Sequence, residues 1–432
     1  MKRTRIAAAL ALSGLALAAC GQNTGNPTSE ENKAGESAVA SPTKERNPEE
    51  ASGPTPRLVA TYDGGILTLD ADSLEVIDDT KLEGFNRLNP AGDGRTVLVS
   101  TSDGFRAFDT GVWTEPHGDH THSYQMPPLL TDTTYEAKKP GHVVPHDGRT
   151  LLFGDGDGSI QELDVSDLKR AYQHNKLAKA KEIAEVTPHH GVAVALPDGG
   201  MIHTMGTEDE RHTVVAKDKD GQEIAKAENC PGVHGEAVAA DGVVLVGCQD
   251  GVLIFTGAHD HGDHSHPAEF RKVTSPDSYG RIGNQAGHED SPVVLGDYKV
   301  KKDPEKVENP TRVSLTNTKT GELKLVDVEA SYSFRSLGRG PNGEALVLGD
   351  DGKLRVIDPE SGEVTGAYPV TKAWKEPEEW QEARPTLFVQ GDVAYVTEPA
   401  AKKIHAVDIA TGHVIKSVDT PESLNELTGV KG

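Results

Sequence analysis

The chain is poor in cysteine, in aromatic residues and in long hydrophobic segments. Only 3 of its 432 residues are cysteine, and aromatic residues make up 5%. The longest apolar run, residues 6–19, is shorter than the roughly 20 residues that a membrane-spanning helix needs. The sequence also lacks HExxH, GxSxG and Walker A motifs, so it carries no signature of a zinc protease, a serine hydrolase or a P-loop NTPase.

Positive charge is scarce as well. The chain has 44 Lys and Arg against 68 Asp and Glu, which gives a formal net charge of −24. Nucleic-acid binding depends on cationic side chains that displace counterions from phosphates, so this balance excludes a nucleic-acid partner. An acidic surface favours cations, but its diffuse field does not select one metal.

The first twenty residues have the pattern of a lipoprotein leader. Lys2, Arg3 and Arg5 precede the apolar run, and the run ends in Leu-Ala-Ala-Cys at residues 17–20. This pattern predicts a signal peptide over residues 1–19 and an acylated Cys20 as the new N-terminus. The alternative is ordinary cleavage beside an incidental cysteine. Removing the three basic residues would make the mature chain still more acidic.

The next segment, residues 21–56, has almost no large apolar side chains. Such a stretch cannot bury enough surface to offset its ordering entropy, so we expect a disordered tether over residues 20–56 and a folded domain over residues 57–432. The protein should therefore be extracytoplasmic and lipid-anchored to the cell membrane, in a periplasm or on a Gram-positive cell surface.

Two cysteines remain after the lipid anchor, Cys230 and Cys248. In an exported protein a pair of this kind is expected to form a disulfide. The alternative is a pair of thiolate ligands for a metal ion.

From residue 57 onward the chain repeats a strand pattern. Apolar segments begin 39 to 54 residues apart, at 58–61, 97–100, 151–154, 201–204, 244–247, 293–296, 345–349 and 393–396. Alternating strands that end in an Asp-to-Gly turn follow most of them, as at 66–73 and 353–362.

Four strands in every 40 to 50 residues or so are typical of a β-propeller. The eight apolar segments predict an all-β fold with a single propeller of eight blades, or of seven if one unit is irregular. We expect residues 424–430 to supply a strand that closes the ring, and residues 178–184 to form a short helical turn.

Histidine is concentrated in two short loops, which hold seven of the 18 histidines. These loops contain His117, Asp119, His120 and His122, and His259, Asp260, His261, Asp263, His264 and His266. Imidazole is the commonest protein ligand for zinc, and carboxylates supply further positions. The loops therefore predict metal binding, with a solvated polar loop as the alternative. Ligand type alone does not separate Zn²⁺ from Cu²⁺ or Ni²⁺.

A second group of histidines opens successive repeats. His142, His190 and His234 lie 9, 11 and 10 residues before the apolar segment of their own repeat. In a propeller these positions approach one end of the central channel, so we expect the three histidines to converge there on a metal site. We expect His288, Glu289 or Asp290 to complete a tetrahedral set, and His189 is a further candidate ligand. The alternative is that these histidines bond locally at strand ends. Arginines occupy the same offset in three other repeats, at Arg87, Arg335 and Arg384.

These features together resemble the AztD family of zinc metallochaperones. The resemblance rests on the repeat-opening histidines, on the segment CPGVHGEA at 230–237 with Cys248, and on the His/Asp loops. It implies an exported β-propeller that delivers Zn²⁺ to the solute-binding protein of a zinc ABC importer. By resemblance, His142, His190 and His234 are candidates for the tight site, and the loop around residues 117–122 for a labile site. The lipid anchor and the second histidine loop depart from the family pattern.

The sequence thus predicts a monomeric zinc metallochaperone rather than an enzyme. Two other functions stay open at this point. One is a surface interaction propeller whose histidine loops are incidental. The other is a metal-dependent hydrolase or lactonase at the channel mouth, with Glu236 or Asp290 as its general base.

Overall fold

The structure is a computed structural model that describes residues 46–173, 177–261, 264–302 and 308–432. These residues belong to one compact unit, Glu45–Gly432. The predicted signal peptide, Cys20, the tether up to residue 45 and Asp263 lie outside the described residues. Within the described ranges, the structure has no helix of the length and apolar character that would cross a membrane.

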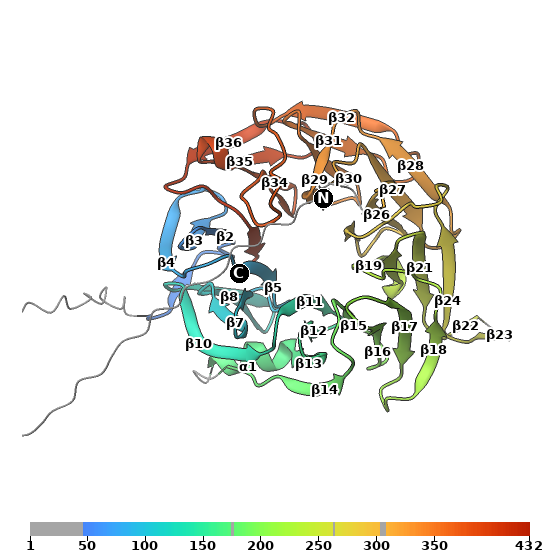
Figure 1. Ribbon diagram of the computed structural model, residues 1–432. Helices are drawn as coiled ribbons and strands as arrows, with labels where there is room; N and C mark the ends of the chain where they lie inside the picture. The colour runs from blue at the N-terminus through green and yellow to red at the C-terminus, as the bar shows by residue number, and fades with distance from the viewer. Residues whose placement is uncertain (1–45, 174–176, 262–263, 303–307) are drawn as a thin grey trace, which may run out of the picture. The chain divides into compact units, whose positions relative to one another are not determined.

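The described residues form eight antiparallel sheets of four strands each. Figure 1 shows these sheets one after another around a central axis, which is the arrangement of a β-propeller. The predicted all-β propeller is confirmed.

The first four sheets in chain order have the following strands. The first contains β2 (Arg57–Tyr62), β3 (Gly65–Asp70), β4 (Val76–Lys81) and the C-terminal β37 (Leu427–Val430). The second contains β5 (Arg87–Pro90), β6 (Thr96–Thr101), β7 (Gly104–Asp109) and β10 (Leu129–Glu136). The third contains β11 (Pro140–His146), β12 (Arg149–Gly154), β13 (Ser159–Asp164) and β14 (Lys181–Glu185). The fourth contains β15 (Ala193–Ala195), β16 (Met201–Gly206), β17 (Arg211–Lys217) and β18 (Glu223–Ala227).

The remaining four sheets repeat this order. The fifth contains β19 (Glu236–Val238), β20 (Val244–Cys248), β21 (Gly251–Thr256) and β24 (Glu269–Thr274). The sixth contains β25 (Gln285–Ala286), β26 (Val293–Asp297), β27 (Arg312–Asn317) and β28 (Leu323–Asp327). The seventh contains β29 (Tyr332–Arg339), β30 (Ala345–Gly349), β31 (Lys353–Ile357) and β32 (Val364–Pro369). The eighth contains β33 (Leu387–Gln390), β34 (Val393–Glu398), β35 (Lys403–Asp408) and β36 (Val414–Asp419).

Each of the eight apolar segments is the second strand in the hydrogen-bonding order of its sheet. In the first sheet this order is β37, β2, β3, β4. The eight segments correspond to β2, β6, β12, β16, β20, β26, β30 and β34. Such a strand has a neighbour on each side and neighbouring sheets above and below, so both of its faces are buried. A strand with one exposed face alternates apolar and polar residues, whereas a strand buried on both faces is apolar throughout. These eight strands therefore appear in the sequence as short apolar runs.

The predicted closing strand is also confirmed. In the first sheet β37 pairs with β2, and Val430 lies opposite Arg57 while Leu427 lies opposite Ala60. The two ends of the folded unit therefore share one sheet.

The hydrophobic core lies between neighbouring sheets. One buried cluster joins Ile202 and Val214 of the fourth sheet to Val246 and Leu253 of the fifth. Another joins the first sheet to the eighth through residues such as Leu67 and Ile404. Apolar side chains fill the interfaces between sheets. Polar side chains can therefore lie at the inner side of the ring, outside these interfaces.

Three elements are inserted between the third and fourth strands of their sheets. They are the hairpin β8 (Val112–His117) and β9 (His120–Gln125), the hairpin β22 (His259–His261) and β23 (His264–His266), and helix α1 (Val165–Gln173). The expected helical turn at 178–184 is wrong, because residues 181–185 pair with β13 as β14. The helix forms earlier, where the Asp164 carboxylate accepts the N–H groups of Ser166 and Asp167 as an N-cap.

Two further sequence predictions concern covalent and terminal structure. The Cys230–Cys248 disulfide is present, with the Cα atoms 5.0 Å apart, and so neither sulfur is left as a thiolate ligand. The predicted tether extends too far toward the folded domain, because Glu49–Ala51 form strand β1, which pairs with β9.

Candidate metal centres

Three histidines that are far apart in the sequence meet at the inner side of the ring. The candidate ligand atoms of His142, His190 and His234 all lie within 4.8 Å of one another. Their ring centroids are 4.8 to 5.7 Å apart. We call these three residues the inner cluster. The sequence prediction that they converge is confirmed as geometry.

Each member of the inner cluster comes from a different sheet. His142 is in β11, His190 lies three residues before β15, and His234 lies two residues before β19. Figure 1 shows β11, β15 and β19 side by side on the inner side of the ring. Since each histidine stands at the start of its sheet, the curvature of the ring brings the three side chains together.

A different carboxylate or carbonyl group lies against the Nδ1 atom of each of the three rings. His190 Nδ1 is 2.5 Å from the Asp155 carboxylate, and His142 Nδ1 is 3.2 Å from the Glu236 carboxylate. His234 Nδ1 donates to the Gly283 carbonyl oxygen at 2.8 Å. These contacts leave Nε2 as the free nitrogen of each ring. Carboxylate or carbonyl groups behind metal-binding histidines fix the tautomer and the ring orientation in this way.

The electrostatics of the inner cluster differ from ring to ring. Burial lowers the pKa of His234, and the charges of Arg281, His142 and His190 lower it further, so it lies well below its usual value. Burial also lowers the pKa of His142, but the carboxylates of Glu236 and Asp155 outweigh burial and the net pKa is raised. His234 is therefore neutral and ready to coordinate, whereas a metal ion must displace a proton from His142 at mildly acidic pH.

His189 does not join the inner cluster, which corrects its prediction as a ligand. Its Nδ1 donates to the Thr187 carbonyl at 2.7 Å, and its Nε2 is 2.8 Å from the Thr204 hydroxyl. The side chain is 1% exposed and packs edge-on against Phe153. With both nitrogens bonded, His189 has none left for a metal ion, and its role is structural.

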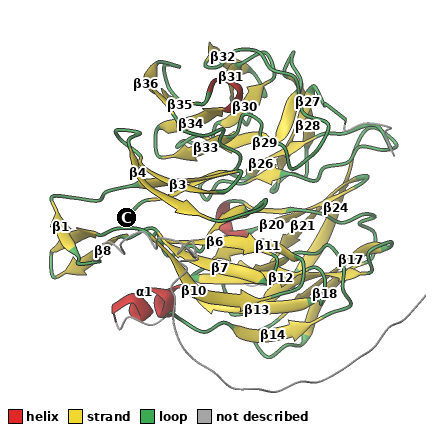
Figure 2. Cartoon of the chain, turned by 60° about the vertical axis from the view of Figure 1, so that its left-hand side comes forward, coloured by secondary structure: helices red, strands yellow, loops and turns green. Residues whose placement is uncertain are grey.

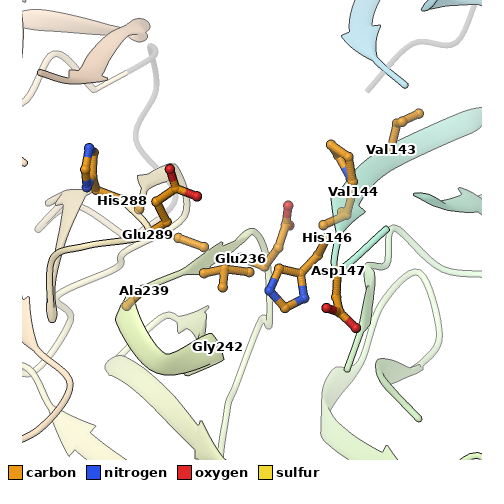
Figure 3. Close-up of a pocket in the computed structure, with 13 residues that line it drawn as sticks. Val143, Val144, His146, Asp147, Glu236, Ala239, Gly242, His288 and Glu289 are labelled. Carbon is orange, nitrogen blue, oxygen red and sulfur yellow. The ribbon is translucent and has the colours of Figure 1, made fainter. Parts of the chain in front are cut away.

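His288 and its neighbours also lie apart from the inner cluster. His288 and Glu289 line a cavity of about 520 Å³ with His146, Asp147 and Glu236. Figure 3 shows Glu236 between His146 on one side and Glu289 and His288 on the other. Asp290 is exposed, and its backbone N–H contacts the His288 ring. The predicted fourth ligand from residues 288–290 is therefore not in place, and Glu236 is the carboxylate that reaches His142.

The three arginines at the equivalent offset are paired with carboxylates. Arg335 lies 2.7 Å and Arg87 lies 3.7 Å from Glu426, and Arg384 lies 3.1 Å from Glu376. The arginines of these three repeats are therefore members of ion pairs.

A second histidine cluster lies on the β8–β9 hairpin. His120 Nε2 is 3.0 Å from His122 Nε2 and 3.4 Å from His117 Nδ1. We call His117, His120 and His122 the hairpin cluster, which is the other three-residue group suited to a metal ion in the described part of the chain. Asp119, a predicted ligand, contacts His120 Nδ1 at 3.2 Å from outside the group.

The spacing of the hairpin cluster follows from strand geometry. His117 and His120 are directly opposite each other across a two-residue turn, in which Gly118 has a φ of +65°. His122 is two residues further along β9, so it lies on the same face as His120. The sequence HGDHTH thus places three imidazoles on one face of a two-stranded ribbon.

Aromatic and ionic contacts hold this hairpin to the ring. The Arg95 guanidinium lies 4.2 Å from the Trp113 ring of β8 and 3.8 Å from the Tyr172 ring of α1. It also forms a two-point ion pair with the buried carboxylate of Asp109, at 2.7 and 2.8 Å. Figure 2 shows β1 and β8 together at the left of the view, where they project from the other strands.

The second histidine loop forms the β22–β23 ribbon. His259 lies opposite His266, and His261 lies opposite His264, in the backbone pairing. This pairing has the same form as that of β8 and β9, with histidines across from each other at the turn.

Known proteins resemble this chain in sequence and in fold. No protein-family model matches the chain. The chain is 27% identical to the zinc chaperone AztD of Citrobacter koseri over 361 residues, which cover 81% of this chain and 80% of that protein. The chain is a homologue of AztD. This finding confirms the resemblance inferred from the sequence.

The structural comparison agrees. The crystal structure of Citrobacter koseri AztD has a TM-score of 0.73 at 22% identity, and it covers 88% of this chain and 99% of that one. The structure of apo AztD from the same organism has a TM-score of 0.71 at 21% identity, with coverage of 88% and 98%. The fold of this chain therefore matches that of the AztD structures over 88% of its residues.

Sequence reasoning missed the carboxylates that orient the histidines. Asp155 lies in the Gly-Asp-Gly-Asp-Gly segment at 154–158, which is typical of a turn between strands. Glu50, whose carboxylate is 2.6 Å from His122 Nδ1, lies in the predicted tether. Glu236 was considered only as a general base. No local pattern marks these residues, because their partners are 35, 72 and 94 positions away.

Proposed function

We propose that this protein is an extracytoplasmic zinc metallochaperone. It holds Zn²⁺ at the inner cluster through His142, His190 and His234, and it carries a more accessible Zn²⁺ site at the hairpin cluster. It passes the ion to the solute-binding protein of a zinc ABC importer.

The observation that carries this proposal is the orientation of the inner cluster. Three imidazoles from three sheets place one candidate ligand atom each within 4.8 Å of the others, and a carboxylate or carbonyl group lies behind each ring. Neutral histidine with such support is the usual ligand arrangement for zinc. The relationship to a protein named a zinc chaperone supports the same metal.

The same geometry favours holding an ion over hydrolysis. The Glu236 carboxylate, the candidate general base for a hydrolase, lies against His142 Nδ1. A general base must reach the water or hydroxyl that it deprotonates. In its present position Glu236 supports a metal ligand.

Transfer would proceed by exchange of ligands. The hairpin cluster is accessible, with the His120 side chain 55% exposed, so a partner can replace its ligands one at a time. The inner cluster is held by the ring and stores the ion more tightly. In both sites protons compete with the metal for histidine, so acid weakens binding.

The anchor and the assembly belong to the same proposal. A signal peptide over residues 1–19, acylation of Cys20 and a tether would hold a monomeric propeller of eight blades, one for each four-stranded sheet, at the membrane surface. Detergent partition of the wild-type protein and of Cys20→Ser tests the anchor. The variant should move to the aqueous phase, and equal partition would contradict acylation.

The central test is zinc stoichiometry followed by transfer. The protein purified without added metal should retain at least one Zn²⁺ by elemental analysis, and a variant with His142, His190 and His234 changed to Ala should lose it. The loaded wild type should then pass zinc to the metal-free solute-binding protein faster than it releases zinc to a chelator.

A matched control separates ligation from damage to the fold. Changing the exposed His413 and His212 to Ala removes histidines outside both clusters and should leave zinc content unchanged. If the wild type retains no zinc, or if transfer is no faster than release to the chelator, a metallochaperone function is wrong.

A further inference from the structure

Strand β1 adds a third strand to the histidine hairpin. Its residues pair with β9 in register, with Glu49 opposite Gln125, Glu50 opposite Tyr124 and Ala51 opposite Ser123. This pairing joins the segment that precedes the propeller directly to the ribbon that carries the hairpin cluster.

The register decides which face Glu50 occupies. Residues directly opposite each other in a sheet share a face, and alternate residues along a strand return to it. Glu50 therefore shares a face with Tyr124 and with His122, two residues away. On this face the Glu50 carboxylate lies 2.6 Å from His122 Nδ1.

This contact has a chemical consequence for the ring. A carboxylate accepts only, so Nδ1 of His122 must carry the proton that is shared with Glu50. The unprotonated nitrogen is then Nε2, which lies 3.0 Å from His120 Nε2 within the cluster. Glu50 thus holds His122 in the tautomer and the orientation that present Nε2 to a metal ion.

A second contact secures the same segment. Arg46 forms an ion pair with the buried carboxylate of Asp109 at 2.5 Å, and its Nε donates to the Pro127 carbonyl at 2.9 Å. Asp109 is the residue that also binds Arg95, which stacks on Trp113 of the hairpin. Residues 46–51 and the hairpin are therefore attached to the ring through one shared carboxylate.

We propose that Glu50 is a positioning residue for the hairpin cluster and that metal binding there is coupled to the docking of strand β1. The proposal rests on the proposed function only for the identity of the ion. Coupling between two binding events is reciprocal. Zn²⁺ at the cluster stabilises the docked strand, and the docked strand strengthens Zn²⁺ binding.

The strand itself offers a matched control. Glu49 carries the same charge one residue away, and its side chain belongs to the opposite face of the sheet. Changing Glu49 to Ala removes one negative charge from β1 and leaves the His122 contact in place. Changing Glu50 to Gln retains an acceptor oxygen and should preserve the tautomer.

The experiment follows His122 in the full chain by ¹⁵N NMR of histidine-labelled protein, with His122→Gln to assign the signal. Without metal, the ring should be protonated at Nδ1 in the wild type, Glu49→Ala and Glu50→Gln, and should become a mixture of tautomers in Glu50→Ala. In a Zn²⁺ titration, Glu50→Ala should need roughly 10 to 100 times more free zinc to saturate His122, the usual loss for an outer partner of a metal ligand. Zinc should also slow hydrogen exchange in the peptide that contains residues 49–51, except in Glu50→Ala.

Equal behaviour of Glu50→Ala and Glu49→Ala in tautomer, titration and exchange would overturn the proposal. If Zn²⁺ shifts His122 in every variant with the same midpoint, the cluster binds zinc without help from Glu50, and the proposed function stands. If Zn²⁺ shifts the NMR signal of His122 in none of the variants or the wild type, both the coupling and the zinc site at the hairpin cluster are wrong. The tautomers measured without metal then still decide whether Glu50 positions the ring.

Discussion

The two histidine clusters contain the same side chains but are built in opposite ways. The hairpin cluster takes its three rings from residues 117–122, so one turn and two short strands are enough to assemble it. The inner cluster takes its rings from three sheets and spans residues 142–234, so three neighbouring sheets must fold and pack before the site exists.

This difference determines how firmly each ligand is held. In the inner cluster the Asp155 side chain is 15% exposed and lies against His190, and the two residues stand in short segments that adjoin strands β12 and β15. In the hairpin cluster the equivalent carboxylate of Asp119 is fully exposed on a turn. A site whose ligands are already ordered loses less entropy on binding, so we expect the inner cluster to bind more tightly and the hairpin cluster to exchange faster.

The largest expected effect comes from removing one ligand of the inner cluster. His190→Ala should weaken zinc binding at that site by more than roughly 100-fold. A loss of about 100-fold is the most that is usual when a group that only supports a metal ligand is removed. Affinity at the hairpin should not change, because the two clusters share no residue. Competition with a chelator of known affinity measures the first quantity, and the His122 NMR signal measures the second. A parallel loss at both sites would mean that they are a single site.

A smaller effect should distinguish the supporting carboxylates. Asp155→Asn should weaken the inner site roughly 10- to 100-fold, because His190 loses a buried partner at 2.5 Å. Asp119→Asn should weaken the hairpin site by less than about 5-fold, because interactions between exposed charges contribute little. The same chelator competition and NMR titration report both values. If Asp119→Asn had the larger effect, the contrast between a rigid and an open site would be incorrect.

A third effect concerns pH. The pKa of His142 is raised, with Glu236 as its main charged partner, so a proton competes with zinc there as the pH falls from 7.5 to 5. The pKa of His234 is well lowered, so its ring takes up a proton only at a lower pH than His142 and competes less with zinc. Affinity at the inner site should therefore fall by at least about tenfold per pH unit below the raised pKa of His142, because at least one proton must be displaced.

Glu236→Gln tests the cause of that pH dependence. Without the carboxylate the pKa of His142 should drop, and the midpoint of the affinity loss should move to lower pH. Chelator competition at several pH values gives this midpoint. An unchanged midpoint would show that Glu236 does not control the protonation of His142.

Much of the fold could be predicted because its signals are local. Strands buried on both faces appear as apolar runs such as 244–247, and the Asp-to-Gly turns between strands recur at regular distances. The misplaced helix shows the limit of this reasoning. Residues 178–184 have reasonable helix propensity, but pairing with β13 stabilises residues 181–185 as a strand.

The site was predictable only in part. His142, His190 and His234 lie at similar distances along the chain before the apolar strands of their repeats. Equivalent positions in successive sheets lie close together, so the convergence of the three rings could be inferred. The same reasoning selected His189, although its neighbours in space, Thr187 and Thr204, engage both of its nitrogens. Distinguishing a ligand from a structural histidine requires knowing which atoms lie behind the ring.

The sequence by itself determined the class of fold, the disulfide pairing, the location of the ring closure and the short segment that carries the hairpin cluster. All of these depend on spacing along the chain or on a single pair of cysteines. The tertiary structure decided which carboxylate supports each histidine, why residues 288–290 stay outside the inner cluster, and that Glu50 reaches His122. These features depend on side chains from separate sheets or strands, and only the folded ring sets the distances between them.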